Sequence, residues 1–444
     1  MKCTPPGFHR SMLRHTPPYA AIRHRGYPMS RFWLTLIYAM LRSRSRSKAR
    51  SQVRPQDGVP LSLSLRSLIA ALGLLGLLVT PARAAAAQAP DPQQLFQQAA
   101  EAQQRGDLAE AVRKYQQLIR LHPEIVAARA NLGTALVALG RFDEAIVQYR
   151  AALAQAPGNR DLRLNLGLAY YKQGDFARAA GEFGPIHDAE PGEVRVATLL
   201  GDCEVRLERY DDVISLVTPL EPANPDNLAL EWLLGFSLIR LGRAQEGLER
   251  VKKVTADGRS AEAFMLAAEA YLKLGQYEEA HRNVDAATRL DPHLAGLQTV
   301  TGMVLEFGGD TKGAAAAFQK ALEANPDDFE AQVRLGSILY TDRDLDAAAP
   351  HLRRALEIRS NSSLARYQWA RLESARGKVE DAVRDLEQVE RQDPEWLEPH
   401  VDLVALYFRL KRPADGARER KIVDQIRADD QQRQSKSRII SPIP

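Results

Sequence analysis

Apolar side chains recur at helical spacing over most of this chain, in short stretches that turn residues separate. Within residues 160–179, Leu166 and Tyr170 stand four residues apart, Gly174 interrupts the stretch, and Ala179 belongs to a second one. Intervals of three and four residues place side chains on one face of an α-helix, and a glycine after such a stretch favours the helix end. The pattern predicts a helix, a turn and a second helix that pack by their apolar faces.

This pattern returns with a fixed period. Counted from Gly106, the turn position recurs every 34 residues, with one interval of 33, at Gly140, Gly174, Glu208, Gly242, Gly275, Gly309, Arg343, Gly377 and Lys411. Prolines at the end of the units keep the same spacing at Pro123, Pro157, Pro191, Pro225, Pro292, Pro326 and Pro394. One helix pair cannot bury its apolar face alone, so a period of this length predicts a stack in which each pair packs on its neighbours.

Two units carry the pattern most clearly. The first, 126–159, has Leu132, Gly133, Gly140, Ala145, Tyr149, Ala152 and Pro157, and the second, 160–193, has Leu166, Gly167, Tyr170, Gly174, Ala179, Phe183 and Pro191. On these residues the chain resembles a tetratricopeptide repeat (TPR) protein. The resemblance implies an all-α fold, a right-handed α-solenoid of about ten helix-turn-helix repeats, with the first helix of each repeat on the concave face.

The register divides most of the chain into ten predicted repeats. Their bounds are 92–125, 126–159, 160–193, 194–227, 228–260, 261–294, 295–328, 329–362, 363–396 and 397–430. A polar tail at 431–444 follows, which we expect to be loose. Pro185 and Pro219 occupy the same register in two second helices, where each is expected to break its helix.

The chain begins with a basic leader, residues 1–66, which we expect to be disordered or in part untranslated, because translation could start at Met29 or Met40. An apolar run at 67–79 and small residues up to 86 follow, as in a secretory signal peptide with its cleavage site. The run is shorter than the roughly 20 residues that a spanning helix needs. We therefore expect export to the periplasm or the exterior. The alternative is an uncleaved membrane anchor, with the repeats outside the cytoplasm.

Charge divides the chain in the same way. The net charge is +4, but residues 1–60 carry twelve Lys and Arg against one acid, Asp57. Arg66 and Arg83 add two more positive charges, which leaves residues 91–444 with a net charge of −9. An acidic repeat region does not provide the basic surface that nucleic acids require. A nucleic-acid partner is not expected.

No catalytic motif occurs in the sequence. It contains no glycine-rich phosphate loop, no paired histidines at metal-ligand spacing and no nucleophile elbow. The six later histidines are scattered over five repeats, and Cys203 is the only cysteine after the leader. We expect Cys203 to be buried, and we expect no enzyme activity, no cofactor and no metal site.

The register of the first helices selects candidate ligand-groove residues. One basic residue falls on each of four successive repeats, beside three aromatic residues; together they are Tyr171, Lys172, Arg206, Trp232, Phe236, Arg240 and Lys273. Exposed aromatic anchors with charge at the rim would suit a protein or peptide partner of acidic character. The same basic residues are also compatible with a solvated helix face.

Asn131 and Asn165 share one first-helix position, 34 residues apart. They are similar to the asparagine ladder in the TPR region of O-linked N-acetylglucosamine transferases, which binds peptide backbones. Leu199 and Leu233 take the next two positions, so the pair is also compatible with the family consensus alone.

These observations predict an exported, non-catalytic scaffold that mediates protein–protein interaction through its concave groove. Two alternatives stay open. One is a membrane-tethered cell-envelope assembly factor, and the other is the TPR partner of a glycosyltransferase-like system.

Overall fold

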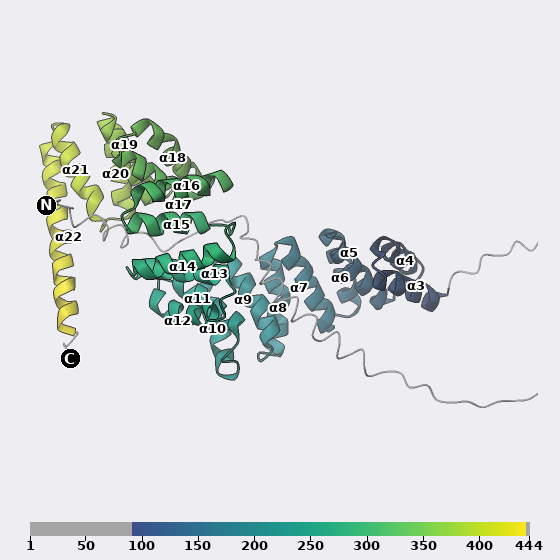
Figure 1. The fold of residues 1–444 in the computed structure, drawn as a ribbon. Helices are drawn as coiled ribbons and strands as arrows, with labels where there is room; N and C mark the ends of the chain where they lie inside the picture. Colours follow the sequence, from purple (N-terminus) through teal and green to yellow (C-terminus); the bar gives the residue numbers. More distant parts are fainter. Residues whose placement is uncertain (1–90, 441–444) are drawn as a thin grey trace, which may run out of the picture. The chain divides into compact units, whose positions relative to one another are not determined.

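A computed structural model of the chain describes residues 91–440 (Figure 1), which are helical apart from short turns and contain no strand. The predicted leader, the signal-like run with its cleavage site and the last four residues lie outside the described part. Two compact units are present, and their boundary lies between Asp212 and Val213. All-α helix pairs stack in both units, so the predicted α-solenoid is confirmed.

The first unit, as far as it is described, covers residues 91–212. Its helices are α3 (Pro92–Gln104), α4 (Leu108–Leu121), α5 (Val126–Ala138), α6 (Phe142–Gln155), α7 (Arg160–Gln173), α8 (Phe176–Ala189) and α9 (Val194–Arg206). Helix α10 (Tyr210–Val217) contains the boundary.

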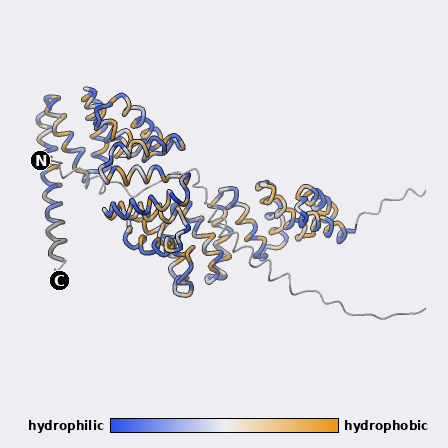
Figure 2. Tube along the Cα trace, viewed as in Figure 1, coloured by the Kyte–Doolittle hydropathy of each residue, from blue (hydrophilic) through white to orange (hydrophobic). Residues whose placement is uncertain are grey.

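The second unit covers residues 213–440. It contains η1 (Thr218–Ala223), α11 (Leu228–Arg240), α12 (Ala244–Thr255), α13 (Ala261–Lys273), α14 (Tyr277–Leu290), α15 (Leu297–Phe307), α16 (Thr311–Ala324), α17 (Phe329–Thr341), α18 (Leu345–Ile358), α19 (Ser363–Ala375), α20 (Val379–Gln392), α21 (Leu397–Arg409) and α22 (Pro413–Ile440). Each 34-residue window therefore holds a first and a second helix. Figure 2 shows that apolar and polar residues alternate along them, as amphipathic packing requires.

Small residues set how closely the two helices of a pair approach. In the third repeat, a Cβ atom on Gly167 of α7 would lie 2.5 Å from Cε1 of Phe183 in α8. Gly302 and Phe318 repeat this contact, also at 2.5 Å, in the seventh repeat. The phenyl ring therefore occupies the space of the missing side chain. These glycines are a packing requirement rather than a source of flexibility.

The turn between the two helices has a left-handed backbone. Glycine takes it in seven of the repeats, but Glu208, Arg343 and Lys411 take it too, with φ between 59° and 66°. These three residues stand at the turn positions that the 34-residue count assigns. The geometry of the repeat, rather than the residue, therefore sets the backbone at this position.

Replacing Arg343 by glycine should raise the free energy of unfolding by about 0.5–1 kcal/mol. A left-handed backbone costs a residue with a side chain about 1–2 kcal/mol, and the greater flexibility of unfolded glycine offsets part of that gain. The reverse change one repeat later, Gly377→Arg, should destabilise by a similar amount. Urea denaturation of both variants measures this. Equal shifts of both midpoints in one direction would contradict it.

A polar contact that we call the repeat bridge recurs in five repeats. A first-helix side chain contacts the backbone carbonyl six residues earlier and a second-helix side chain 19 residues later. The five bridges are centred on Arg129, Arg163, Gln332, Arg366 and His400. The carbonyl belongs to the proline that closes the preceding repeat, or to Ser360 where that proline is missing. The bridge thus fixes the two helices of a repeat and the turn before them.

Two local expectations fail. Pro185 does not break its helix, because α8 continues to Ala189 with Phe183 and Ile186 buried on either side of the proline. Pro219 does end an α-helix, since α10 stops at Val217 and gives way to η1.

The tail expected to be loose instead continues α22 as far as Ile440. Cys203 is buried, as expected.

None of the helices within residues 91–440 is both long and apolar enough to span a bilayer. The apolar run at 67–79 is outside that range.

Candidate functional site

The first helices form a shared surface in each unit. Successive first helices contact one another, α5 with α3 and α7 in the first unit, and α11 through α19 in the second, more extensively than successive second helices do. Helices that lie closer together form the shorter, inner side of a curved stack. We call this surface of each unit its inner face.

In the first unit, Tyr171 and Arg206 meet through a residue that the sequence did not single out. The hydroxyl of Tyr171 donates to Oδ2 of Asp202 at 2.7 Å, and Nε of Arg206 lies 3.7 Å from the same atom. Burial raises the pKa of Asp202, while the Arg206 charge opposes the shift. The guanidinium also lies over the Phe176 ring. These contacts tie α7 to α9.

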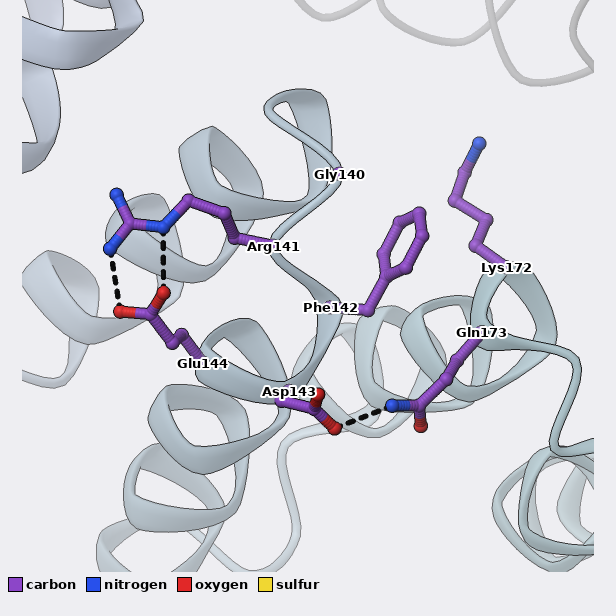
Figure 3. Close-up of a pocket in the computed structure, with 7 residues that line it drawn as sticks. All are labelled: Gly140, Arg141, Phe142, Asp143, Glu144, Lys172 and Gln173. Atoms are coloured by element: carbon purple, nitrogen blue, oxygen red, sulfur yellow. Dashed lines mark hydrogen bonds and ion pairs between the residues drawn. The ribbon is translucent and has the colours of Figure 1, made fainter.

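The remaining candidates of the first unit have different surroundings. The side-chain amide of Asn131 donates to the hydroxyl of Tyr115 at 3.2 Å, and Asn165 is half-buried. Lys172 is exposed. It lines a pocket of about 340 Å³ (Figure 3) between the turns of two repeats, with Asp143 and Gln173 hydrogen-bonded to each other on one side.

In the second unit, Trp232, Phe236, Arg240 and Lys273 lie close together. The aromatic pair is half-buried rather than exposed, with ring centroids 5.8 Å apart. Arg240 lies over the Phe236 ring and donates to Glu269 at 2.8 Å. Nζ of Lys273 donates to the carbonyl of Ile239 at 2.9 Å, and burial lowers the pKa of this amine.

Six of the nine predicted groove residues therefore fall into two clusters, one in each unit. Two of the four predicted cations have carboxylate neighbours: Arg206 lies beside Asp202, one turn earlier on its own helix, and Arg240 pairs with Glu269 on the next first helix. The charged rim inferred from the sequence is thus in part an internal network that links successive first helices.

Sequence reasoning missed three further members of the asparagine position. Counting on from Asn165 in repeat steps gives Leu199, Leu233, Leu266 and Val300, and then Arg334, Gln368 and Asp402. Arg334 pairs with Glu306 and Glu330. The 34-residue period could have identified these three residues, but polar side chains return at this position only after four apolar ones.

Gln368 and Asp402 have buried polar atoms without a hydrogen-bond partner among the described residues. The atoms are Nε2 of Gln368, whose side chain is 1% exposed, and Oδ2 of Asp402. Oε2 of Glu398, one helical turn before Asp402, is a third. Leaving such a group unpaired costs roughly 1–3 kcal/mol. The inner face of the ninth and tenth repeats therefore has unused capacity for hydrogen bonds.

Charged and aromatic groups surround these atoms. The guanidinium of Arg371 lies 4.6 Å from the ring centroid of Tyr340 and 5.6 Å from that of Tyr367. Burial raises the pKa of Asp402, while the charge of Arg371 and a hydrogen bond with Tyr367 oppose that shift. The arrangement offers one amide donor and two carboxylate acceptors beside an aromatic surface.

Solved structures resemble the chain over parts of its length. A tetratricopeptide repeat protein from Parabacteroides merdae is 18% identical, covering 55% of this chain and 97% of its own, with a TM-score of 0.46. Human IFIT1, a dimer with m7Gppp-AAAA, is 15% identical, covering 74% and 89%, with a TM-score of 0.46. MamA MSR-1 is 27% identical, covering 39% and 98%, with a TM-score of 0.34. No curated protein sequence matches.

The family comparison agrees with the period and with the helix pairs. The model described as tetratricopeptide repeat matches residues 96–160, 131–184, 164–212, 233–295 and 300–363. These ranges together span more than half of the chain. The chain belongs to the tetratricopeptide repeat family.

Proposed function

We propose that the chain is an exported, non-catalytic scaffold that binds a segment of a protein partner on its inner face. The tetratricopeptide fold is that of a protein–protein interaction scaffold, and its members are typically non-catalytic. This supports the general role. The bound segment, its place on the array and export are parts of our proposal.

The unpaired buried atoms of Gln368 and Asp402 support this proposal most directly. A peptide group offers one acceptor and one donor, which match the free amide N–H of Gln368 and the free carboxylate oxygen of Asp402. Packed helices lie roughly 10 Å apart and an extended chain rises roughly 3.3 Å per residue. An extended segment would therefore present a peptide group to successive repeats about every third residue.

The test uses two matched variants of the full chain. Gln368→Leu with Asp402→Leu removes both free atoms, whereas Arg384→Glu changes an exposed residue on the second helix of the ninth repeat. Crosslinking in the native compartment, followed by mass spectrometry, should recover a partner with the wild type and the control. We expect the double variant to recover at least about tenfold less, since each lost bond contributes roughly 1 kcal/mol. Equal recovery with unchanged helicity would refute this site.

The second cluster provides a separate arm of the same experiment. Trp232→Ala with Arg240→Glu disrupts the groove predicted from the sequence in the fifth repeat. Loss of the partner from this variant alone would place binding there and not at Gln368 and Asp402. Arg206 in the first unit and Arg240 in the second already have carboxylate neighbours, so our proposal does not require an acidic partner.

Export rests on the signal-like run at 67–79 and the small residues after it. Sequencing the mature N-terminus should give a start at Ala85 or Ala87, directly after one of the two small-residue sites. A start upstream of Ala82 together with retention in carbonate-washed membranes would favour the alternative of a membrane-tethered assembly factor. Sugar transfer by an associated enzyme would favour a glycosyltransferase-like partner, and mass spectrometry of the captured proteins would identify it.

A further inference from the structure

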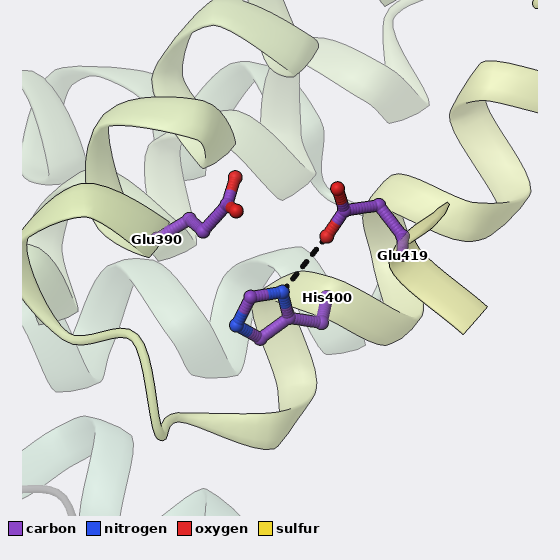
Figure 4. A group of neighbouring side chains, drawn as sticks. All are labelled: Glu390, His400 and Glu419. Atoms are coloured by element: carbon purple, nitrogen blue, oxygen red, sulfur yellow. Dashed lines mark hydrogen bonds and ion pairs between the residues drawn. The ribbon is translucent and has the colours of Figure 1, made fainter. Parts of the chain in front are cut away.

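We propose that Glu390, His400 and Glu419 bind a divalent transition-metal ion, best Zn²⁺, between the last three helices. The three residues come from α20, α21 and α22 and point toward one another (Figure 4). Their ligand atoms all lie within 4.8 Å of one another. His400 and Glu419 are 1% and 0% exposed, and Glu390 is half-buried.

The repeat bridge supplies the comparison that singles this cluster out. At the same bridge position, Arg129, Arg163 and Arg366 are permanent cations that donate both to a carbonyl and to a second-helix acceptor. His400 occupies that position with a ring that has only two nitrogens. Nε2 lies 3.0 Å from the carbonyl oxygen of Pro394, which can only accept, so Nε2 bears the proton.

This assignment leaves Nδ1 facing carboxylates. Nδ1 lies 2.9 Å from Oε2 of Glu419, and the neutral ring would point a lone pair at an oxygen that is itself an acceptor. A proton, carried by the ring or by the carboxyl group, or a metal ion must lie between them. Metal-bound histidines characteristically donate their other ring N–H to a backbone carbonyl, as His400 does to Pro394.

Charge favours the metal. Besides the largely exposed Arg418, a doubly protonated His400 provides one positive charge for two carboxylates, the half-buried Glu390 and the buried Glu419. Oε1 of Glu419 has no hydrogen-bond partner, although the largely exposed Arg418 lies 3.4 Å from it. A divalent ion would balance both carboxylates and accept the lone pair of neutral His400. Imidazole with two carboxylates is a ligand set that suits Zn²⁺ and leaves a fourth position for water.

The geometry requires a small adjustment. Ligand atoms around a tetrahedral Zn²⁺ stand roughly 3.3 Å apart, given bonds of about 2.0–2.1 Å. The present spread of 4.8 Å closes if the Glu390 carboxylate moves by roughly 1.5 Å. Glu390 is the least buried of the three and has the freedom to do so. A bound ion would join the last three helices of the stack.

Sequence reasoning predicted no metal site because no ligand motif is present. Glu390, His400 and Glu419 are separated by ten and 19 residues, and only the helix packing brings them together. The period nevertheless marks His400 as unusual, since the same position one repeat earlier is an arginine, Arg366.

The experiment titrates Zn²⁺ into the full-length protein after treatment with a chelator, and follows binding by calorimetry and the melting temperature. The wild type should bind one equivalent with a raised melting temperature. His400→Arg is the decisive variant. Arginine can form the bridge in the tenth repeat as Arg366 does in the ninth, but it cannot bind the metal. We expect its metal-free melting temperature to match the wild type and its Zn²⁺ affinity to fall at least about tenfold. Glu390→Gln should also weaken binding.

Two results would overturn the proposal. If the wild type binds no Zn²⁺, His400 and Glu419 form an imidazolium–carboxylate pair in the manner of the other bridges. If His400→Arg and Glu390→Gln bind Zn²⁺ as the wild type does, the ion is held elsewhere, for example at the exposed pair of His281 and Asp285. Neither result bears on partner binding at Gln368 and Asp402, so the two proposals stand or fall separately.

Discussion

Replacing Phe183 by alanine is expected to lower the free energy of unfolding by about 3–5 kcal/mol, the usual cost of emptying a buried aromatic site. Phe183 is fully buried between α7 and α8, and its ring fills the space beside Gly167. In a stack where each pair supports its neighbours, the loss should spread to adjacent repeats. Urea denaturation and hydrogen exchange over α7 and α8 measure the effect.

Two glycine variants of the third repeat control this prediction. Gly167→Ala should destabilise, because its Cβ would lie 2.5 Å from the Phe183 ring. Gly181→Ala, with nothing within 4 Å of its Cβ, should instead stabilise α8 by up to about 1 kcal/mol. In the Phe183→Ala background, Gly167→Ala should lose most of its cost. Strictly additive losses would show that the ring does not occupy this space.

Replacing Glu419 by leucine is expected to destabilise the tenth repeat by about 3–5 kcal/mol in metal-free buffer. Breaking a buried ionic pair leaves its partner uncompensated, and here His400 would lose the acceptor at its Nδ1 atom. Hydrogen exchange should show α21 and α22 opening while α11 to α16 keep their protection, because stability in a repeat array is local.

Asp415→Ala is the matched control for this change. Asp415 lies in the first turn of the same helix and pairs with Arg412 and Arg418 on the surface, where ion pairs contribute little. The exchange of α21 and α22 should stay unchanged in this variant. Equal protection in Glu419→Leu and the wild type would show that the His400 pair contributes nothing to the fold.

The fold could be predicted almost entirely from the sequence. A 34-residue period assigns the helix pairs, and even the left-handed turns at Glu208, Arg343 and Lys411 follow from it. The period is a local property that each repeat carries in its own residues. Pro185 shows where local reasoning fails, because the buried side chains on either side hold α8 together against the lost backbone hydrogen bond.

The candidate site could be predicted only in part. The register placed Tyr171, Arg206 and Arg240 on the first helices, but not the acids that meet them. The acids that meet Tyr171 and Arg240 lie 31 and 29 residues away on the next repeat, so the packing of neighbours decides these two pairings. Arg206 meets Asp202 within its own helix. Gln368 and Asp402 lay within reach of the register and were missed only because the count stopped at the first apolar positions.

The repeat bridge also bears on how such a chain changes its length. In the second repeat, the carbonyl of Pro123, Arg129 and Gln148 all lie within one 34-residue segment. A segment of that length that starts at the proline closing the preceding repeat carries the donor and both acceptors together when it is duplicated or deleted. Recombination in whole repeats therefore creates junctions that are already complete, and the array can evolve longer or shorter forms without first inventing a new contact.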